Sequence, residues 1–129
     1  MSQENIEIVR GIFDRWNRKE RDFVEGEVHP DVEIRSRLQA EPYRGWAGLK
    51  LWMQEIDDQF EEWQLVVKEW RDTGDLVVGL GHIGIRGQGS GIEFDQPIGW
   101  LVELSEGKPR RMEFFVEPRD ALAAAGLAE

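Results

Sequence analysis

The residues best suited to proton transfer in this sequence are its two histidines and its single tyrosine. His82 lies in the segment LGHIG, inside a predicted strand, where an imidazole can act as a base near neutral pH or bind a ligand oxygen. Alternatively, His82 faces solvent or a partner subunit. Tyr43 precedes a predicted helix, so its hydroxyl can donate at the mouth of a cavity or pack on the surface. We predict His82 and Tyr43 as the catalytic candidates and interpret His29, before Pro30, as a turn residue.

Metal and nucleotide chemistry are not indicated. His29 and His82 are far apart in the chain and cysteine is absent, so the ligand spacing of a metal site is missing. Residues 79–84, GLGHIG, match the G-x-G-x-x-G pattern, but no helix follows them, as a dinucleotide site requires. Sheet curvature and bulges explain these glycines better. The carboxylates of Glu93 and Asp95 are expected on the surface of a strand, and we predict no metal and no cofactor.

Length and charge limit the classes of protein. The 129 residues predict a single domain, 1–129, with a core of its own. A net charge of −10 argues against partners that are nucleic acids or anionic membranes. The absence of cysteine fits a reducing compartment, the first residues carry no signal-peptide pattern, and no apolar run is long enough for a membrane span. We therefore predict a cytoplasmic protein.

The first half of the chain predicts helices and short strands. An apolar stripe predicts a helix over residues 2–17, and a short helix follows at about 22–26. Residues 32–36 predict a strand, with Val32, Ile34 and Ser36 on one face. Spacings of three and four predict a long helix over 46–60, and residues 62–74 predict a strand. Pro118 and Gly126 are suited to begin and end a last short helix.

Residues 75–117 predict three antiparallel strands joined by glycine turns. We interpret Ser105, Glu106 and Gly107 as a three-residue hairpin loop, because a two-residue primed turn would force Glu106 to positive φ. This loop predicts three facing pairs, which are Leu104 with Lys108, Trp100 with Met112, and Ile98 with Phe114. The apolar residues of both strands then share one face of the sheet.

Together these elements predict the α+β class. We expect a cone-shaped, curved antiparallel or mixed sheet wrapped around the long helix, with the N-terminal helices closing one face, a cystatin-like α+β barrel. The large aromatic side chains suit either a bulky core or the wall of a roomy cavity. The convergence of the helix stripes on the apolar sheet face predicts a mainly apolar cavity lined by Phe13, Trp16, Trp52, Met53, Ile98, Trp100, Met112 and Phe114.

Several segments, in order, resemble one family. Residues 4–36 (ENIEIVRG to DVEIRS), 43–56 (YRGWAGLKLWMQEI), 86–108 (RGQGSGIEFDQPIGWLVELSEGK) and 116–127 (VEPRDALAAAGL) are similar to SnoaL-like proteins. These belong to the nuclear-transport-factor-2-like superfamily. The resemblance implies a cone-shaped fold that serves ketosteroid isomerases, polyketide cyclases, scytalone dehydratase, limonene epoxide hydrolase and non-catalytic binding domains.

The resemblance also implies where catalytic groups would stand. The position of the isomerase base corresponds to Ser36, and that of the first-helix tyrosine to Ile12 or Phe13. The position of the neutral acid corresponds to Gly99 or Trp100, and that of the acid on the final strand to Phe114. A shift of one residue would bring Glu113 there instead, but the predicted register points Glu113 at the opposite face. The usual acid–base set of the family is therefore expected to be largely absent.

Two functional classes follow. In the first, the protein is an isomerase-, cyclase- or dehydratase-like enzyme for a small hydrophobic molecule, with His82 as proton carrier and Tyr43 as hydrogen-bond donor. In the second, it binds a small hydrophobic molecule or a protein partner without catalysis. We also predict a homodimer through the sheet face turned away from the helices, because Phe115 and part of the segment VVGLGHIGI would add apolar side chains there.

Overall fold

The computed structural model of the chain describes residues 2–36, 41–87 and 93–127. Its helices are α1 (Ser2–Asn17), α2 (Val24–Glu27), α3 (Gly45–Gln59) and α4 (Pro118–Ala124). Its strands are β1 (Glu33–Ser36), β2 (Tyr43–Arg44), β3 (Phe60–Thr73), β4 (Leu76–Gly87), β5 (Glu93–Ser105) and β6 (Lys108–Phe115). The predicted α+β class is confirmed, and the short strand β2 is an element that was not predicted.

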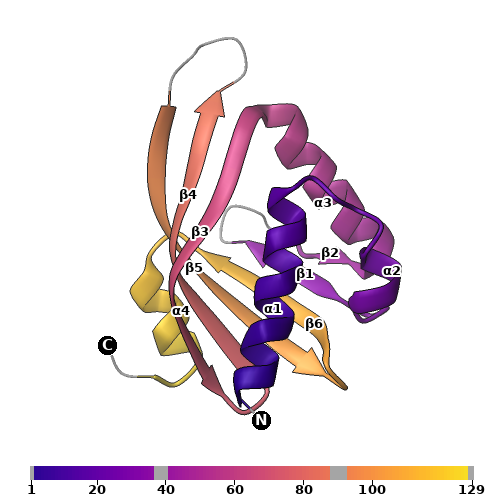
Figure 1. Cartoon of the computed structure of the whole chain (residues 1–129), viewed down its shortest axis with the longest axis vertical. Helices are drawn as coiled ribbons and strands as arrows, with labels where there is room; N and C mark the ends of the chain where they lie inside the picture. Colours follow the sequence, from indigo (N-terminus) through magenta and orange to yellow (C-terminus); the bar gives the residue numbers. More distant parts are fainter. Residues whose placement is uncertain (1, 37–40, 88–92, 128–129) are drawn as a thin grey trace.

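The strands form one curved, mixed sheet in the order β2-β1-β6-β5-β4-β3 (Figure 1). Strand β1 runs parallel to β6, and the other neighbouring pairs are antiparallel. The sheet curves around α1 and α3 but does not close into a barrel. This arrangement encloses a core on the concave side of the sheet, as the resemblance implied.

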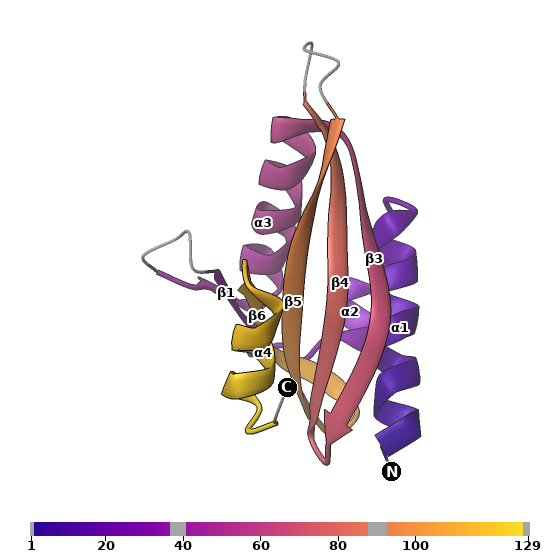
Figure 2. The same ribbon diagram turned by 90° about the vertical axis from the view of Figure 1, so that its left-hand side faces the viewer.

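Alternating residues of each strand point to different layers. Val77 and Trp100 belong to the core between the sheet, α1 and α3. Their neighbours Val78 and Leu101 belong to a second, smaller cluster with Leu122 of α4. Helix α4 therefore covers the outer face of the sheet, as Figure 2 shows from the side. The predicted covering of one face by the N-terminal helices is confirmed, and the last helix, whose position was not predicted, folds back onto the other face.

The hairpin between β5 and β6 differs from its predicted register. Glu106 and Gly107 have φ values of 55° and 77°, so the loop is a two-residue primed turn and Glu106 takes the left-handed conformation. An irregularity after Glu103 shifts the register by one further residue, and Trp100 faces Phe114. The predicted pairing was therefore wrong by one residue next to the turn, where Leu104 pairs with Pro109, and by two residues beyond Glu103. Because side chains alternate with a period of two, the even shift beyond Glu103 leaves Trp100, Met112 and Phe114 on their predicted face.

The glycine-rich segment of the G-x-G-x-x-G pattern lies inside β4, as predicted, and it accommodates a bulge in β3. The register of β3 against β4 changes between Val67 and Glu69, which face Gly81 and Leu80. A Cβ atom at Gly81 would lie 1.9 Å from the backbone oxygen of Val66. Only glycine fits here, so the motif has a structural explanation in the sheet.

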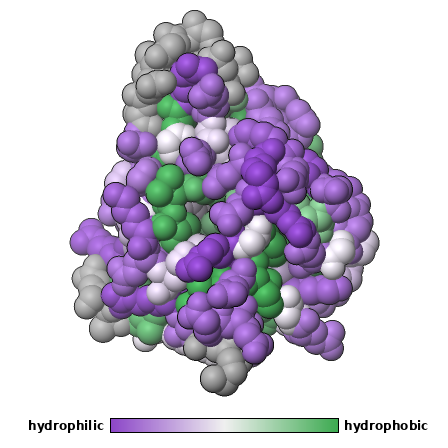
Figure 3. Space-filling view, in the orientation of Figure 1, coloured by the Kyte–Doolittle hydropathy of each residue, from purple (hydrophilic) through white to green (hydrophobic). Residues whose placement is uncertain are grey.

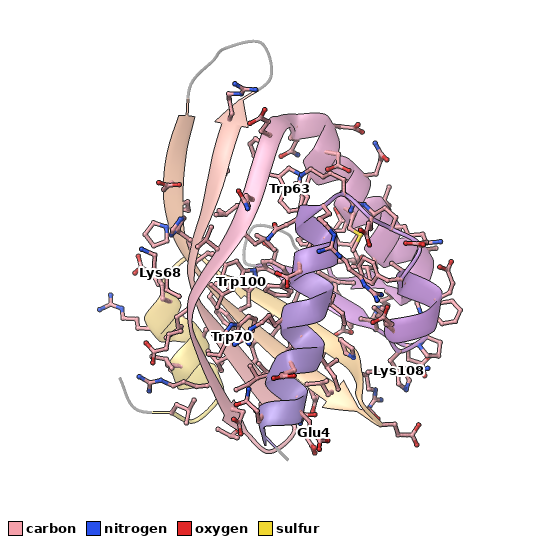
Figure 4. All side chains as sticks on the ribbon, viewed as in Figure 1. Glu4, Trp63, Lys68, Trp70, Trp100 and Lys108 are labelled. Carbon is pink, nitrogen blue, oxygen red and sulfur yellow. The ribbon has the colours of Figure 1, made fainter. Side chains whose placement is uncertain are left out.

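Aromatic residues fill the core beneath α1. Phe13 of α1 lies 5.7 Å from Trp70 and 5.5 Å from Trp100, measured between ring centroids. In Figure 4, Trp63, Trp70 and Trp100 all lie in the layer between the sheet and the helices in front of it. The predicted stripe of α1 is confirmed, since Ile6, Val9, Phe13 and Trp16 are all buried.

Figure 3 shows one face of the molecule, on which hydrophilic residues predominate and hydrophobic residues gather near the centre. No helix in the part of the chain that the structure describes is long and apolar enough to cross a membrane.

Candidate functional site

A cavity of about 410 Å³ lies between α3, α1 and the concave face of the sheet. Its volume is within the range typical of small-molecule sites. Most of its wall is apolar, and the lining residues are Trp16, Ser36, Trp52, Glu55, Ile56, Gln59, Phe60, Trp63, Leu65, Ile83, Ile85, Gln96, Ile98, Phe114, Phe115 and Val116.

Helix α3 supplies the wall opposite the sheet. Helix positions i, i+3, i+4 and i+7 share one face, and here they are Trp52, Glu55, Ile56 and Gln59. The helix begins at Gly45, whose φ of 72° suits glycine and whose N–H donates to the carbonyl of Val32 at 2.7 Å. That bond ties the start of α3 to the segment before β1, and it directs the lining residues toward the sheet.

Aromatic rings form the buried end of the cavity. The ring centroids of Trp16 and Phe114 each lie 4.8 Å from that of Trp52, with tilted planes. Trp63 lies 5.7 Å from Trp16, and its indole N–H donates to Asp57 Oδ1 at 2.9 Å. These mutual contacts hold the rings in place, so the wall exists before any ligand binds.

Polar groups lie nearer the open end. Glu55 is half-buried, and its Oε1 accepts a hydrogen bond from the hydroxyl of Tyr43. Gln59 and Val116 are exposed, which places them at the mouth. The cavity therefore combines an aromatic interior with a polar rim that includes a carboxylate.

The predicted lining residues divide into two groups. Trp16, Trp52, Ile98 and Phe114 line the cavity. Phe13, Met53, Trp100 and Met112 are not among the lining residues, and they pack in the closed core. For Trp100 of β5 the reason is geometric, because Phe13 of α1 packs directly on its ring and leaves no open space there.

His82 lies on the opposite face of the sheet. Its neighbour Ile83 lines the cavity, whereas His82 pairs with Pro97 on β5, and its Nε2 lies 4.0 Å from Asp95 Oδ1. Its side chain is 26% exposed. The predicted role of His82 inside the cavity is therefore corrected, because alternation along β4 directs its imidazole away from the cavity.

Tyr43 does not line the cavity itself, but its hydroxyl reaches the wall through Glu55. The sequence analysis did not single out Glu55. The signal was present, since Glu55 stands three residues after the predicted lining residue Trp52 on the same helix. Glu55 was overlooked because only the apolar residues of the helix were used to predict which face lines the cavity.

The structure also shows where the residues lie that correspond to the catalytic positions of the family. Ser36 and Phe114 line the cavity, whereas Trp100 is closed in the core. Glu113 is on the outer face, where Arg111 Nη1 lies 3.5 Å from its carboxylate. The predicted outward direction of Glu113 is confirmed.

Comparisons with known proteins agree on the fold. A SnoaL-like polyketide cyclase, as it is described, from Jannaschia sp. CCS1 has a TM-score of 0.81 and 20% identity, covering 99% of this chain and 95% of that one. TerC, co-crystallised with polyporic acid, has a TM-score of 0.78 and 20% identity, with 95% and 97% covered. A protein with a ketosteroid isomerase-like fold from Catenulispora acidiphila DSM 44928, in complex with trimethylamine, has a TM-score of 0.77 and 17% identity, with 95% and 94% covered.

Sequence comparison assigns the family. No curated protein matches the chain. The model of the SnoaL-like domain matches residues 9–112, which is most of the 129 residues. The matched residues begin within α1 and end within β6, before the lining residues Phe114, Phe115 and Val116. The chain belongs to the SnoaL-like domain family.

Proposed function

We propose that this protein binds a small molecule with a flat or alicyclic apolar body in the cavity between α3 and the sheet. The observation that carries the proposal is the cavity itself, with its volume of about 410 Å³ and its pre-packed aromatic end. An apolar ligand would gain from leaving water, and the rings would need little rearrangement to receive it.

Intrinsic fluorescence tests this proposal directly, because Trp16, Trp52 and Trp63 line the cavity. Titration with steroid-like and polyketide-like ring compounds is expected to change the tryptophan emission in a saturable way. Replacing Ile83 with phenylalanine adds bulk inside the cavity and is expected to weaken binding by roughly tenfold or more.

Val66→Phe is the matched control. Val66 faces His82 across β3 and β4, on the side of the sheet away from the cavity, so the added ring should leave binding unchanged. Equal loss in both variants would indicate a general effect on the sheet. No saturable change with any ring compound would remove the proposal.

A second candidate is an enzyme of the isomerase or cyclase type that moves a proton within the cavity. The observation that favours it is the carboxylate of Glu55 at the wall, held by the hydroxyl of Tyr43. A carboxylate in an apolar cavity can remove a proton from a carbon beside a carbonyl. The description of the Jannaschia sp. CCS1 protein as a polyketide cyclase supports this class of reaction.

The rate of proton exchange in a simple carbonyl compound tests this second function without knowledge of the natural substrate. We expect the protein in D₂O to accelerate deuterium incorporation beside the carbonyl of 2-tetralone, followed by proton NMR. In Glu55→Gln the rate of deuterium incorporation should fall by about 10²–10⁴-fold, which is the usual contribution of a general base. The reason is that an amide cannot accept the proton as a carboxylate does. A rate equal to that of buffer would leave the protein as a binding domain.

A further inference from the structure

We propose that the cavity selects a ligand whose polar end is a positively charged nitrogen and that Glu55 provides the counter-charge. The inference rests on the proposed ligand-binding function and adds the chemical class of the ligand. It depends on three observations: the charge of the described lining residues, the second carboxylate oxygen of Glu55, and the aromatic rings that line the same cavity.

The described part of the wall carries a single kind of charge. Among the described residues that line the cavity, Glu55 is the only one with an ionisable side chain, and none is lysine, arginine or histidine. The other polar lining residues, Ser36, Gln59 and Gln96, are neutral. An anionic ligand would therefore meet repulsion without a compensating cation.

The carboxylate of Glu55 is oriented but incompletely paired. Its Oε1 accepts the hydrogen bond from Tyr43, which restricts rotation of the carboxylate. Within residues 2–36, 41–87 and 93–127 no further hydrogen bond or ion pair to Glu55 is found. Its second oxygen is thus available to a bound molecule.

Binding would change the solvation of this group. A ligand that fills the cavity displaces water from Glu55, which is already half-buried beside apolar walls. Removing water from a carboxylate without supplying a partner is unfavourable, whereas a cation at the second oxygen compensates for the loss. A protonated or quaternary amine satisfies this need.

The aromatic lining favours the same ligand. Cations are attracted to the faces of tryptophan and phenylalanine rings. Trp63 already takes part in such an interaction, because Lys19 Nζ lies 3.4 Å from its ring centroid. Lys19 is not among the lining residues, so its ammonium does not provide the missing partner of Glu55.

Two probe molecules of equal shape show how the charge of the ligand affects its Kd, independently of its size. Benzyltrimethylammonium and neopentylbenzene differ in that a positively charged nitrogen replaces a carbon atom. The Kd of each is measured by tryptophan fluorescence with the full chain, and the anion 3-phenylpropanoate serves as a third probe. We expect the unmodified protein to bind the cation at least about tenfold more tightly than the neutral isostere, and the anion most weakly.

Variants assign the preference to Glu55. Glu55→Gln is expected to abolish the preference for the cation: binding of the cation weakens because its counter-charge is lost, and binding of neopentylbenzene tightens because no carboxylate has to lose water. Tyr43→Phe removes the hydrogen bond that orients the carboxylate, so the preference should fall only in part. Asp58→Asn is the matched control: Asp58 is exposed on the same helix and accepts a hydrogen bond from Gln54, so it alters net charge without altering the wall.

Each outcome either supports or overturns the proposed charge selectivity of the cavity. Equal Kd values for the cation and its isostere would overturn the charge selectivity, while binding of the isostere would uphold the proposed ligand-binding function. A preference that persists in Glu55→Gln, or that Asp58→Asn lowers equally, would also overturn the role of Glu55. If no probe binds, both the selectivity and the binding of ring compounds of this size are refuted.

Discussion

Glu55 illustrates how a single side chain can define a site. It stands on the same face of α3 as Trp52 and Ile56, both of which are apolar. An isolated carboxylate in such surroundings must be solvated, paired or in contact with a ligand, because burial without a partner is costly. The hydrogen bond from Tyr43 meets only part of that requirement.

Glu33 shows the opposite situation, in which a carboxylate is fully paired. Its two oxygens lie 2.6 Å from Arg35 Nε and 2.9 Å from Arg44 Nη1. The hydrogen bond from Arg35, followed by the charges of Arg35, Arg44 and Arg111, holds the pKa of Glu33 below its ordinary value. The cluster ties β1 to β2 and β6 at the edge of the sheet.

The depressed pKa of Glu33 predicts how stability depends on pH. The charged form stabilises the folded state fully above the unfolded pKa, ordinarily 4.5, and this contribution is lost as the pH falls through the lower folded value. Glu33→Gln should therefore reduce stability at pH 7, by about 0.5–1 kcal/mol for a pair with exposed partners.

Thermal unfolding of Glu33→Gln and the unmodified protein from pH 7 to pH 3 measures this effect. The difference in Tm should shrink below pH 4.5 and disappear once the carboxyl group is protonated in both states. A difference that is constant over this range would exclude the charge of Glu33 as its cause.

The elements of the fold depend on close approach at particular glycines. At Gly99 of β5, a Cβ atom would lie 2.7 Å from the Cβ of Ala121 in α4. The absence of a side chain lets α4 pack on the outer face, over Val78 and Leu101. The sequence predicted α4 from Pro118 and Gly126, but the face it covers depends on this contact between distant residues.

Replacement of Gly81 tests the bulge in β3. In Gly81→Ala the new methyl group would overlap the backbone oxygen of Val66, 1.9 Å away, and a backbone atom cannot rotate out of the way. We expect a loss of about 3 kcal/mol in the free energy of unfolding, measured with urea.

Gly11→Ala is the control for the same substitution. Gly11 lies within α1, and a Cβ atom there would meet nothing within 4 Å. Alanine is the better helix former, so this variant should gain about 1 kcal/mol. Destabilisation of similar size in both variants would disprove the steric explanation at Gly81.

The whole molecule presents two sheet faces with different roles. The concave face encloses the core and the cavity, and α4 covers part of the outer face. Phe115, whose apolar side chain motivated the predicted dimer interface, is only 1% exposed because it packs with Ala121 and Leu122. The apolar part of that face is therefore smaller than expected.

We propose that two copies of the chain associate through the rest of the outer face, around Val66, His82 and Pro97. Light scattering at micromolar concentration is expected to give a mass of about twice 15.0 kDa. Val66→Glu would place a charge in this interface and should shift the mass toward that of one chain. A mass near 15.0 kDa for the unmodified protein would rule the dimer out.

Local pattern determined much of this fold. Periodicity located α1, α3 and the long strands, and the strand alternation placed Trp100 and Phe114 on the same face even though the register was wrong by two residues. These features depend on side chains near one another in the chain, and period-two alternation tolerates an even error.

Tertiary structure decided the site. The direction of His82 depends on how β4 pairs through its glycines, and the contact between Tyr43 and Glu55 joins β2 to α3. Whether an apolar side chain lines the cavity or fills the core depends on where α1 and α3 touch the sheet. The sequence by itself determined which residues face inward, and only packing between distant segments determined which inward residues surround open space.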